Sequence, residues 1–271
     1  MRFSRRQLMI STATATGLAM LPLRAKRTRR TFVLVPGTWH GGWVWSPVAE
    51  LLRARGHRCF AVTCTGVGER AHLITPETGL ATHVTDVASV IEFEQLDNVI
   101  LVGHSFGGIT ITGVADLLGK RVAQLVFYDA FIPTPERPAW VRRDDNGQWP
   151  AWWQERKAKF IDGYKMSFFE DYTIRMLVDP DTHPTIAASV AQRLTWHPAR
   201  QWTDRVSFAN GGWQDTPRSY VHCVGQTHRQ TSAAMFGPAT QPGWNFIESP
   251  TQRLGMLTQP ALTADLLDSL G

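Results

Sequence analysis

Two hydrophobic patterns alternate along the first half of the chain. Short apolar runs rich in β-branched residues, typical of buried strands, occupy residues 31–35, 58–63, 98–102 and 122–128. Between them, apolar residues recur at helical spacing, clearest at Val84, Val87 and Ile91 and again over residues 109–118. Strands that alternate with helices predict an α/β fold with a mostly parallel central sheet and right-handed crossovers.

Local turn chemistry marks the first helix. Ser46 is expected as its N-cap and Pro47 as its first helical residue, because a Ser side chain can accept an orphan backbone N–H and Pro lacks one. Gly56 is expected to end this helix.

The alternation breaks after residues 131–133. Residues 134–217 are rich in Pro, Asp and Trp and contain helix-like pieces without a clear strand. Seven of the eleven tryptophans fall there, so we expect an inserted helical, Trp-rich cap. Strand-like runs at residues 219–224 and 245–247 and a helix at 260–270 complete the pattern, which predicts a core made of residues 31–133 and 218–271.

Residues 1–30 have the composition of a targeting leader. They hold eight Lys or Arg and no acid, and Arg5 and Arg6 precede a mild apolar stretch in a twin-arginine pattern. This pattern predicts handling by the twin-arginine export machinery and a periplasmic or secreted protein; an amphipathic or disordered N-terminus is the alternative. Removing the eight leader cations from the total of 28 leaves 20 basic residues against 23 acidic ones, a formal charge of −3.

The composition of the chain after the leader excludes several classes of binding partner. A body with a slight negative charge carries no nucleic-acid footprint, and no apolar run is long enough to predict stable membrane insertion. Cys59, Cys64 and Cys223 have no metal-ligand spacing, and we expect neither a metal nor a cofactor.

A tight turn with a central serine follows the third predicted strand. Gly103-His104-Ser105-Phe106-Gly107 lies between that strand and an apolar helix. A nucleophilic serine on such a turn needs small residues two positions before and after it, because its backbone is strained. Ser105 is therefore the candidate nucleophile, with a structural turn as the alternative.

Backbone amides near this turn are candidate oxyanion donors. The turn itself offers the N–H of Phe106, and the glycine-rich loop after the first strand offers the N–H of Thr38. In the same region Trp39, His40 and His104 are candidate substrate contacts. His40 can instead hold the loop by hydrogen bonds, and His104 should point away from the nucleophile.

Five stretches resemble the plant-esterase-like branch of the α/β hydrolases, which includes methyl-salicylate-type esterases, hydroxynitrile lyases and many bacterial esterases. They are VPGTWHGGW at 35–43, TGVGERAHL at 65–73, LVGHSFGG at 101–108, YDAFIP at 128–133 and MLTQP at 256–260. The resemblance runs over nearly the whole chain after the leader. It implies the α/β-hydrolase fold and a cofactor-free enzyme with a small, apolar, cap-covered pocket.

The sequence departs from this branch at the base and the acid. Arg253 stands where the resemblance implies a histidine, and Gln226 stands where it implies a carboxylate. A guanidinium stays protonated and cannot accept the serine proton. Asp129 is a candidate relocated acid or a loop hydrogen-bonding residue, and His228 is a candidate relocated base or a surface residue. The other late histidines, His183, His197 and His222, show no constellation.

Arg253 itself has two interpretations. It can put a fixed positive charge beside Ser105, or it can point to solvent or pair with a cap carboxylate.

Three functions stay open. The first is an exported hydrolase of small apolar or aromatic carboxyl esters that uses Ser105. The second is a non-hydrolytic lyase, isomerase or cyclase that uses Arg253 electrostatically, and the third is an inactive ligand-binding protein. The intact Ser105 turn favours the first two, whereas the missing histidine and carboxylate favour the last two.

Overall fold

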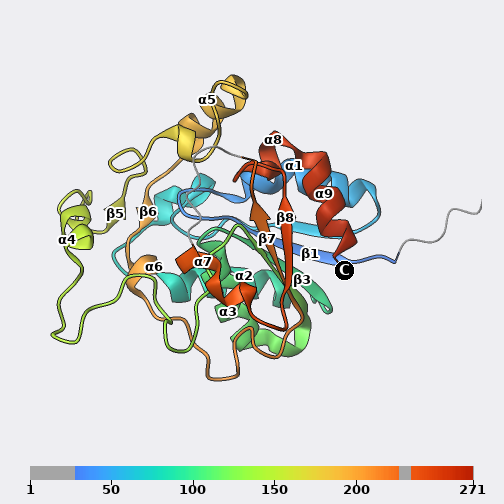
Figure 1. Ribbon diagram of the computed structural model, residues 1–271, viewed down its shortest axis with the longest axis horizontal. Helices are drawn as coiled ribbons and strands as arrows, with labels where there is room; N and C mark the ends of the chain where they lie inside the picture. The colour runs from blue at the N-terminus through green and yellow to red at the C-terminus, as the bar shows by residue number, and fades with distance from the viewer. Residues whose placement is uncertain (1–27, 226–232, 271) are drawn as a thin grey trace, which may run out of the picture.

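A six-stranded, wholly parallel sheet forms the centre of the computed structural model, which describes residues 28–225 and 233–270 (Figure 1). Its strand order is β2-β1-β3-β4-β7-β8. The strands are β1 (Thr31–Val35), β2 (Arg58–Ala61), β3 (Val99–His104), β4 (Val122–Tyr128), β7 (Arg218–Cys223) and β8 (Asn245–Ser249). The expected α/β class is confirmed, whereas the twin-arginine pattern, Gln226 and His228 lie outside the described residues.

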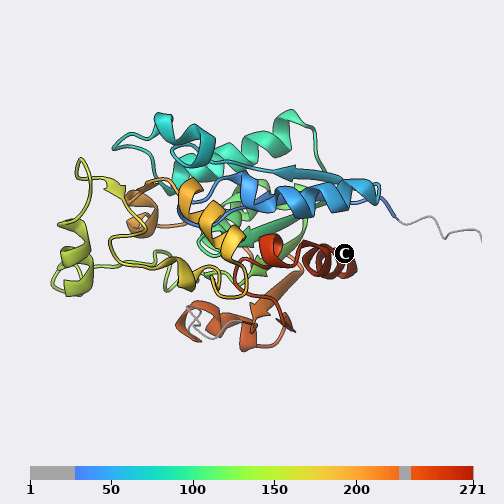
Figure 2. The ribbon, with the colours of Figure 1, turned by 90° about the horizontal axis from the view of Figure 1, so that it is seen from above.

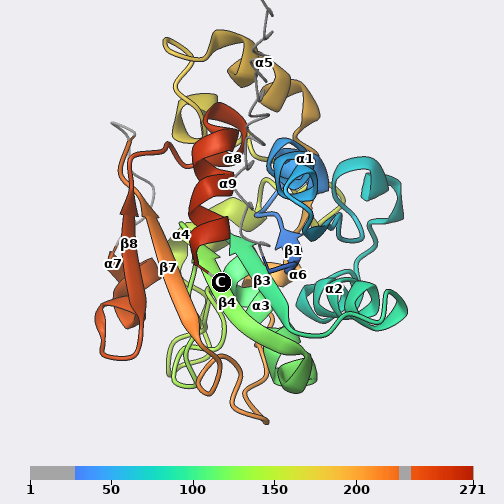
Figure 3. The same ribbon diagram turned by 90° about the vertical axis from the view of Figure 1, so that its right-hand side faces the viewer.

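Helices cover both faces of this sheet (Figure 3). One face carries α1 (Ser46–Ala54), α8 (Gly255–Thr258) and α9 (Pro260–Ser269), and the other carries α2 (Leu80–Phe93) and α3 (Gly107–Leu118). Alternate strand residues divide between the two cores: Phe32 and Leu34 pack with the first group, and Val33 and Val35 with the second. Burial on both faces explains why the strand sequences are continuously apolar.

The segment between β4 and β7 crosses the edge of the sheet where the strands end. Figure 2 shows its outer part, around α4, at the opposite end of the molecule from the C-terminus. It contains α4 (Ala151–Lys157), β5 (Lys165–Met166), a 3₁₀ turn η4 (Ile174–Met176), α5 (Pro184–Arg193), β6 (His197–Pro198) and α6 (Arg200–Thr203). Strands β5 and β6 form a two-residue antiparallel ribbon, which the sequence did not predict. Treating 134–217 as a separate cap stays a prediction.

The remaining short elements are 3₁₀ turns at element boundaries and one helical turn. They are η1 (Gly42–Trp45), η2 (Gly68–Leu73), η3 (Gly119–Arg121), η5 (Gly237–Thr240) and α7 (Ala233–Phe236). The turn η1 changes one expectation. Trp45 precedes α1 in a helical conformation, so Ser46 is the first helical residue and not a side-chain cap. Gly56 follows the end of α1 with a φ of 94°, as expected for a left-handed terminator.

The three cysteines are buried free thiols. Burial removes the thiolate from water and raises the pKa of Cys59 and of Cys223 to about 12, and it raises the pKa of Cys64 as well. Among the described residues, no helix combines the length and apolarity that a membrane crossing requires.

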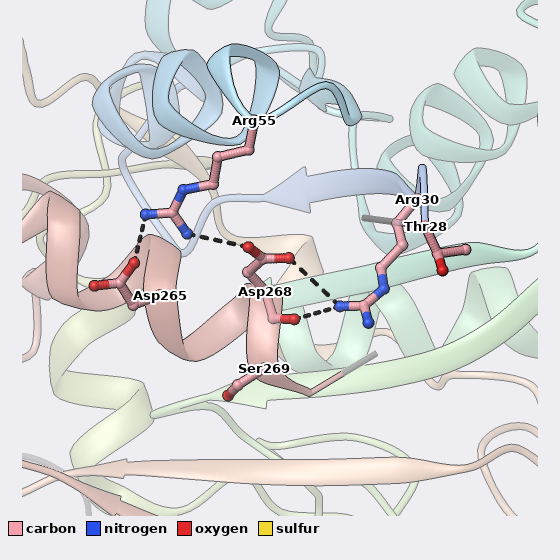
Figure 4. A pocket seen from close by; sticks show the side chains of 6 residues that line it. All are labelled: Thr28, Arg30, Arg55, Asp265, Asp268 and Ser269. Carbon is pink, nitrogen blue, oxygen red and sulfur yellow. Dashed lines mark hydrogen bonds and ion pairs between the residues drawn. The ribbon is translucent and has the colours of Figure 1, made fainter. Parts of the chain in front are cut away.

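A cavity of about 320 Å³ lies where the strands begin, at the edge of the sheet opposite to Ser105 (Figure 4). Its charged residues pair with one another. Arg55 lies 2.5 Å from Asp265 and 3.3 Å from Asp268, and Arg30 lies 3.5 Å from Asp268. These ion pairs join the start of β1 and the end of α1 to the last helix, which makes the cavity a structural junction.

We expect Gly108→Ala to destabilise the fold, because a Cβ at this position would lie 2.2 Å from the carbonyl oxygen of Phe131. The backbone must move to admit it, at about 1–3 kcal/mol of unfolding free energy. Gly119→Ala is the matched control, since a Cβ there meets nothing within 4 Å and its backbone is already α-helical. Urea unfolding measures both variants, and equal stabilities would contradict the packing argument.

Candidate functional site

Ser105 lies at the sharp bend between β3 and α3. Its φ of 52° is in the left-handed region, which costs free energy for a residue with a side chain. The bend is also tight: a Cβ on Gly103 would lie 2.6 Å from the carbonyl oxygen of Gly107, and one on Gly107 would lie 2.8 Å from that of Pro36. These approaches explain the two glycines of the predicted turn and give Ser105 the strained conformation expected of a nucleophile.

The loop after β1 presses directly against this bend. A Cβ on Gly37 would come within 2.7 Å of the Cβ of Ser105, so only glycine fits. Thr38 is buried next to it, and neither its N–H nor that of Phe106 donates a hydrogen bond to any described residue. Two buried amides beside a serine hydroxyl, with no acceptor among the described residues, are suited to a developing oxyanion.

Among the residues that the structure describes, Arg253 is the side chain that hydrogen-bonds to the Ser105 hydroxyl. Its Nη2 donates to Ser105 Oγ at 2.5 Å, and its Nη1 donates to the carbonyl oxygen of Asp129 at 3.1 Å and to the Asp129 carboxylate. Both charged residues are buried. The hypothesis of a fixed cation beside Ser105 thus matches the structure, whereas the alternatives of a solvent-facing side chain and of a partner in the cap are wrong.

Asp129 does more than stabilise its own loop. It follows β4 with a φ of 44°, and its N–H donates to the carbonyl oxygen of Val221 on β7 at 2.7 Å. This fixed backbone directs the carboxylate at Arg253, so Asp129 balances the charge of the guanidinium beside Ser105. Its second oxygen lies 3.7 Å from Nδ1 of His222.

This geometry determines what the hydroxyl can do. Every hydrogen-bonding group of a guanidinium is a donor, so Ser105 Oγ accepts the bond from Arg253. The cation lowers the free energy of a Ser105 alkoxide but cannot remove the proton that forms it. The described part of the chain therefore supplies electrostatic stabilisation at Ser105 and no contacting base.

The two candidate histidines near the oxyanion loop are buried. His40 Nδ1 lies 2.6 Å from the carbonyl oxygen of Thr38, as expected for a residue that holds the loop. Burial lowers the pKa of His40 to about 4, with a further contribution from the charge of Arg253. The pKa of His104 is lowered well below its usual value by burial, then by Arg253 and His40. Substrate contact by Trp39, His40 or His104 stays a prediction.

A hydrogen-bonded chain that the sequence did not reveal supports the same loop. Trp39, whose φ is 66°, donates its N–H to His197 Nδ1 at 3.2 Å, and His197 Nε2 hydrogen-bonds to Gln201. Gln201 continues to His83 Nδ1 at 2.9 Å, and His83 Nε2 reaches the carbonyl oxygen of Thr65 at 2.9 Å. The bonds are mutually compatible only when both imidazoles are neutral. His197 is therefore part of a buried hydrogen-bond network, contrary to the expectation from the sequence.

Aromatic rings form the wall beside the bend. Phe106 stacks on Trp202 with ring centroids 5.1 Å apart, and Trp39 contacts Trp202, Phe168 and Tyr172. These rings come from the core and from the segment between β4 and β7. Trp202 therefore packs that segment against the core next to the bend that carries Ser105.

A buried arginine sits among these rings, and the sequence did not single it out. The Arg156 guanidinium lies 4.7 Å from the Trp202 ring and 4.8 Å from the Tyr172 ring, and its Nη1 donates to the Tyr172 hydroxyl at 2.8 Å. Asp171, 3.2 Å from Nε, balances its charge. No group of three potential ligand side chains that could hold a metal ion occurs among the described residues.

We expect the stability of this protein to fall steeply below pH 6.5. Burial lowers the pKa of His40, His83, His104 and His197 in the folded chain, so the unfolded chain binds more protons than the folded chain once the pH drops below about 6.5. Each histidine then lowers the free energy of unfolding by about 1.4 kcal/mol per pH unit.

Urea unfolding between pH 8 and pH 5 measures this slope. His104→Asn should reduce the slope by the contribution of one proton, whatever its effect on the stability at pH 8. Replacement of the exposed His72 should leave the slope unchanged. A flat profile for the wild-type protein would refute the assignment of four neutral imidazoles.

Sequence comparison identifies relatives over nearly the whole described chain. The profile of the family described as "Alpha/beta hydrolase family" matches residues 32–266. A "Carbendazim hydrolyzing esterase" from Nocardioides sp. (strain SG-4G) is 34% identical over 247 residues, which are 89% of this chain and 99% of the relative. An "Alpha-hydroxynitrile lyase" from Arabidopsis thaliana is 39% identical over 108 residues, which are 38% of this chain and 40% of the relative.

Structural comparison agrees on the fold. An extracellular α/β-hydrolase from a Paenibacillus species matches with a TM-score of 0.71 at 23% identity, covering 89% of this chain and 99% of that one. The resemblance suggested by the sequence motifs is thereby confirmed: this chain belongs to the alpha/beta hydrolase family, among relatives of the esterase type.

Proposed function

We propose that this protein hydrolyses small aromatic or apolar carboxyl esters through Ser105, and that it favours esters whose leaving alcohol is acidic, such as phenols. The observation that carries the proposal is the 2.5 Å contact between Arg253 Nη2 and Ser105 Oγ. A cation at that distance favours the ionised hydroxyl, and the Thr38 and Phe106 amides are available for the oxyanion that its attack creates.

The replacement of the histidine dictates the preference for the leaving group. In the acylation step, Ser105 Oγ attacks the ester carbonyl, its proton passes to water, and the alcohol leaves as its anion. Arg253 cannot protonate that anion as a histidine would, because the guanidinium keeps its proton at all ordinary pH values. A phenolate, whose conjugate acid has a pKa of about 10, departs without protonation far more readily than an alkoxide does. Water then hydrolyses the acyl-enzyme.

The aromatic surroundings support a flat, apolar substrate. Trp39, Trp202, Phe168 and Phe106 contact one another beside the bend and offer large ring faces. The esterase from Nocardioides, similar over nearly its full length, supports ester hydrolysis as the reaction class.

We expect the wild-type protein to cleave p-nitrophenyl butyrate at least about tenfold faster than Ser105→Ala, with kcat/KM that falls steeply as the leaving-group pKa rises. Arg253→His should flatten that dependence, because a neutral imidazole next to Asp129 can take the serine proton and return it to the leaving group. Arg253→Lys is the matched control: it keeps a cation without a base and should keep the steep dependence.

The outcomes separate the alternatives. If no ester is cleaved faster than by Ser105→Ala, hydrolysis is ruled out and the non-hydrolytic lyase, isomerase or cyclase and the inactive binding protein remain. If activity then appears in Arg253→His, alone or with Gln226→Asp, the native protein is a disarmed hydrolase. The Asp129 partner of Arg253 already argues against binding of an anionic substrate at this position, since it balances the guanidinium charge.

We also propose that the protein is exported by the twin-arginine machinery, on the basis of Arg5 and Arg6 and the apolar stretch behind them. Arg5→Lys/Arg6→Lys should leave the unprocessed protein in the cytoplasm, whereas Arg2→Lys, outside the pattern, should be exported normally. Cell fractionation followed by immunoblotting measures both, and export of the double variant would contradict the proposal.

A further inference from the structure

A groove of about 480 Å³ opens on the surface between the segment that follows β4 and the start of α4, the helix at the left of Figure 1. Its charged and aromatic lining includes Arg137, Arg142, Arg143, Trp140, Trp149 and Trp152. None of these residues belongs to the Ser105 site. Three arginines and three tryptophans in one groove form a site of distinctive chemistry that ester cleavage leaves unexplained.

The groove carries an excess of positive charge, with three arginines and one carboxylate, Asp144, in its lining. Within the described ranges, none of its three arginines lies within ion-pair distance of a carboxylate. Arg142 donates to the carbonyl oxygen of Glu136 at 3.1 Å and Arg143 to that of Gly147 at 2.6 Å. The lining carboxylate of Asp144 accepts the backbone N–H groups of its own turn through Oδ1.

The burial of the Arg137 guanidinium costs free energy. Its Nε is buried without a hydrogen-bond partner among the described residues, so the groove leaves a desolvated donor unsatisfied. Burial, and then the neighbouring charge of Arg142, lower the pKa of Arg137. An anion that accepts a hydrogen bond from Arg137 would satisfy the unpaired donor and offset the repulsion between the neighbouring cations.

The aromatic side chains select the shape of that anion. The Arg143 guanidinium lies 4.2 Å from the Trp149 ring centroid, and the Arg137 guanidinium lies 4.8 Å from that of Trp140. Stacking of this kind holds the guanidinium groups flat and orients their donor edges. Trp152 is 47% exposed and offers a free ring face at the same groove.

We propose that this groove binds a small aromatic carboxylate, with its carboxylate held by Arg137 and Arg143 and its ring packed on the exposed indole of Trp152. The groove lies close to the bend that carries Ser105. A smaller pocket shares Arg137 and Trp140 with it and is also lined by Phe131, whose N–H donates to the carbonyl oxygen of Ser105 at 3.0 Å. Aromatic carboxylates are also the acids that hydrolysis of aromatic esters releases, yet binding in the groove requires no hydrolysis.

Calorimetric titration with 2-naphthoate tests the proposal. Arg137→Met/Arg143→Met should weaken binding at least about tenfold, because bidentate charge-assisted bonds to the carboxylate are lost. Arg121→Met, a partly exposed arginine on η3, is the matched control and should bind as the wild type does. The neutral isostere 2-naphthamide should bind at least about tenfold more weakly than 2-naphthoate.

The ¹⁹F NMR spectrum of protein labelled with 5-fluorotryptophan locates the ligand. The Trp149 resonance, which is assigned by its loss in Trp149→Phe, should shift on titration. Hydrolysis of p-nitrophenyl butyrate by the double arginine variant should stay at the wild-type level, which separates this proposal from that of the Ser105 site. Absence of binding at millimolar 2-naphthoate, or equal affinity in the double variant, would overturn the proposal. So would equal affinity for 2-naphthamide.

Discussion

The ion pair between Arg253 and Asp129 organises the surroundings of Ser105. Two buried charges are stable only together, since removal of either partner leaves an uncompensated ion and typically costs about 3–5 kcal/mol. Asp129 is in turn held by its strained backbone and by its hydrogen bond across to β7. The pairing of β4 with β7 therefore fixes a carboxylate, the carboxylate fixes a guanidinium, and the guanidinium fixes the hydroxyl of Ser105.

The same guanidinium shapes the electrostatics of its surroundings. Its charge adds to burial in keeping His40 and His104 neutral, so the imidazoles around Ser105 serve as packing and hydrogen-bonding groups. The chain of His197, Gln201 and His83 extends this neutral, buried framework into the segment between β4 and β7. In the described part of the chain, the charged side chains beside Ser105 are this one pair, and the amides of the bend and of the β1 loop are the available donors.

Much of this arrangement follows from local sequence signals. The strands, the Ser105 turn and the glycine-rich loop are encoded by apolar runs and by glycines whose Cβ atoms would clash, so pattern alone locates them. Residues that meet across the fold are harder to anticipate. His83 and His197 are joined through Gln201 over more than one hundred positions, and the burial of Arg156 depends on rings from three segments.

Element boundaries that depend on tertiary contacts could not be predicted from local sequence either. Ser46 resembles a helix cap, but a preceding 3₁₀ turn moves it inside the helix. The β5–β6 ribbon is only two residues long on each side, too short for alternation to show. The sequence could place Arg253 at the position of the missing histidine, but its contact with Asp129 depends on the course of β4 in space.

The three cysteines bear on the redox environments that this protein tolerates. Disulfide exchange and oxidation both proceed through an accessible thiolate. Thiols that are enclosed by the core and ionise only at high pH offer neither the charge nor the access that oxidants need. The folded chain can consequently meet a reducing or an oxidising compartment with its three cysteines remaining free thiols.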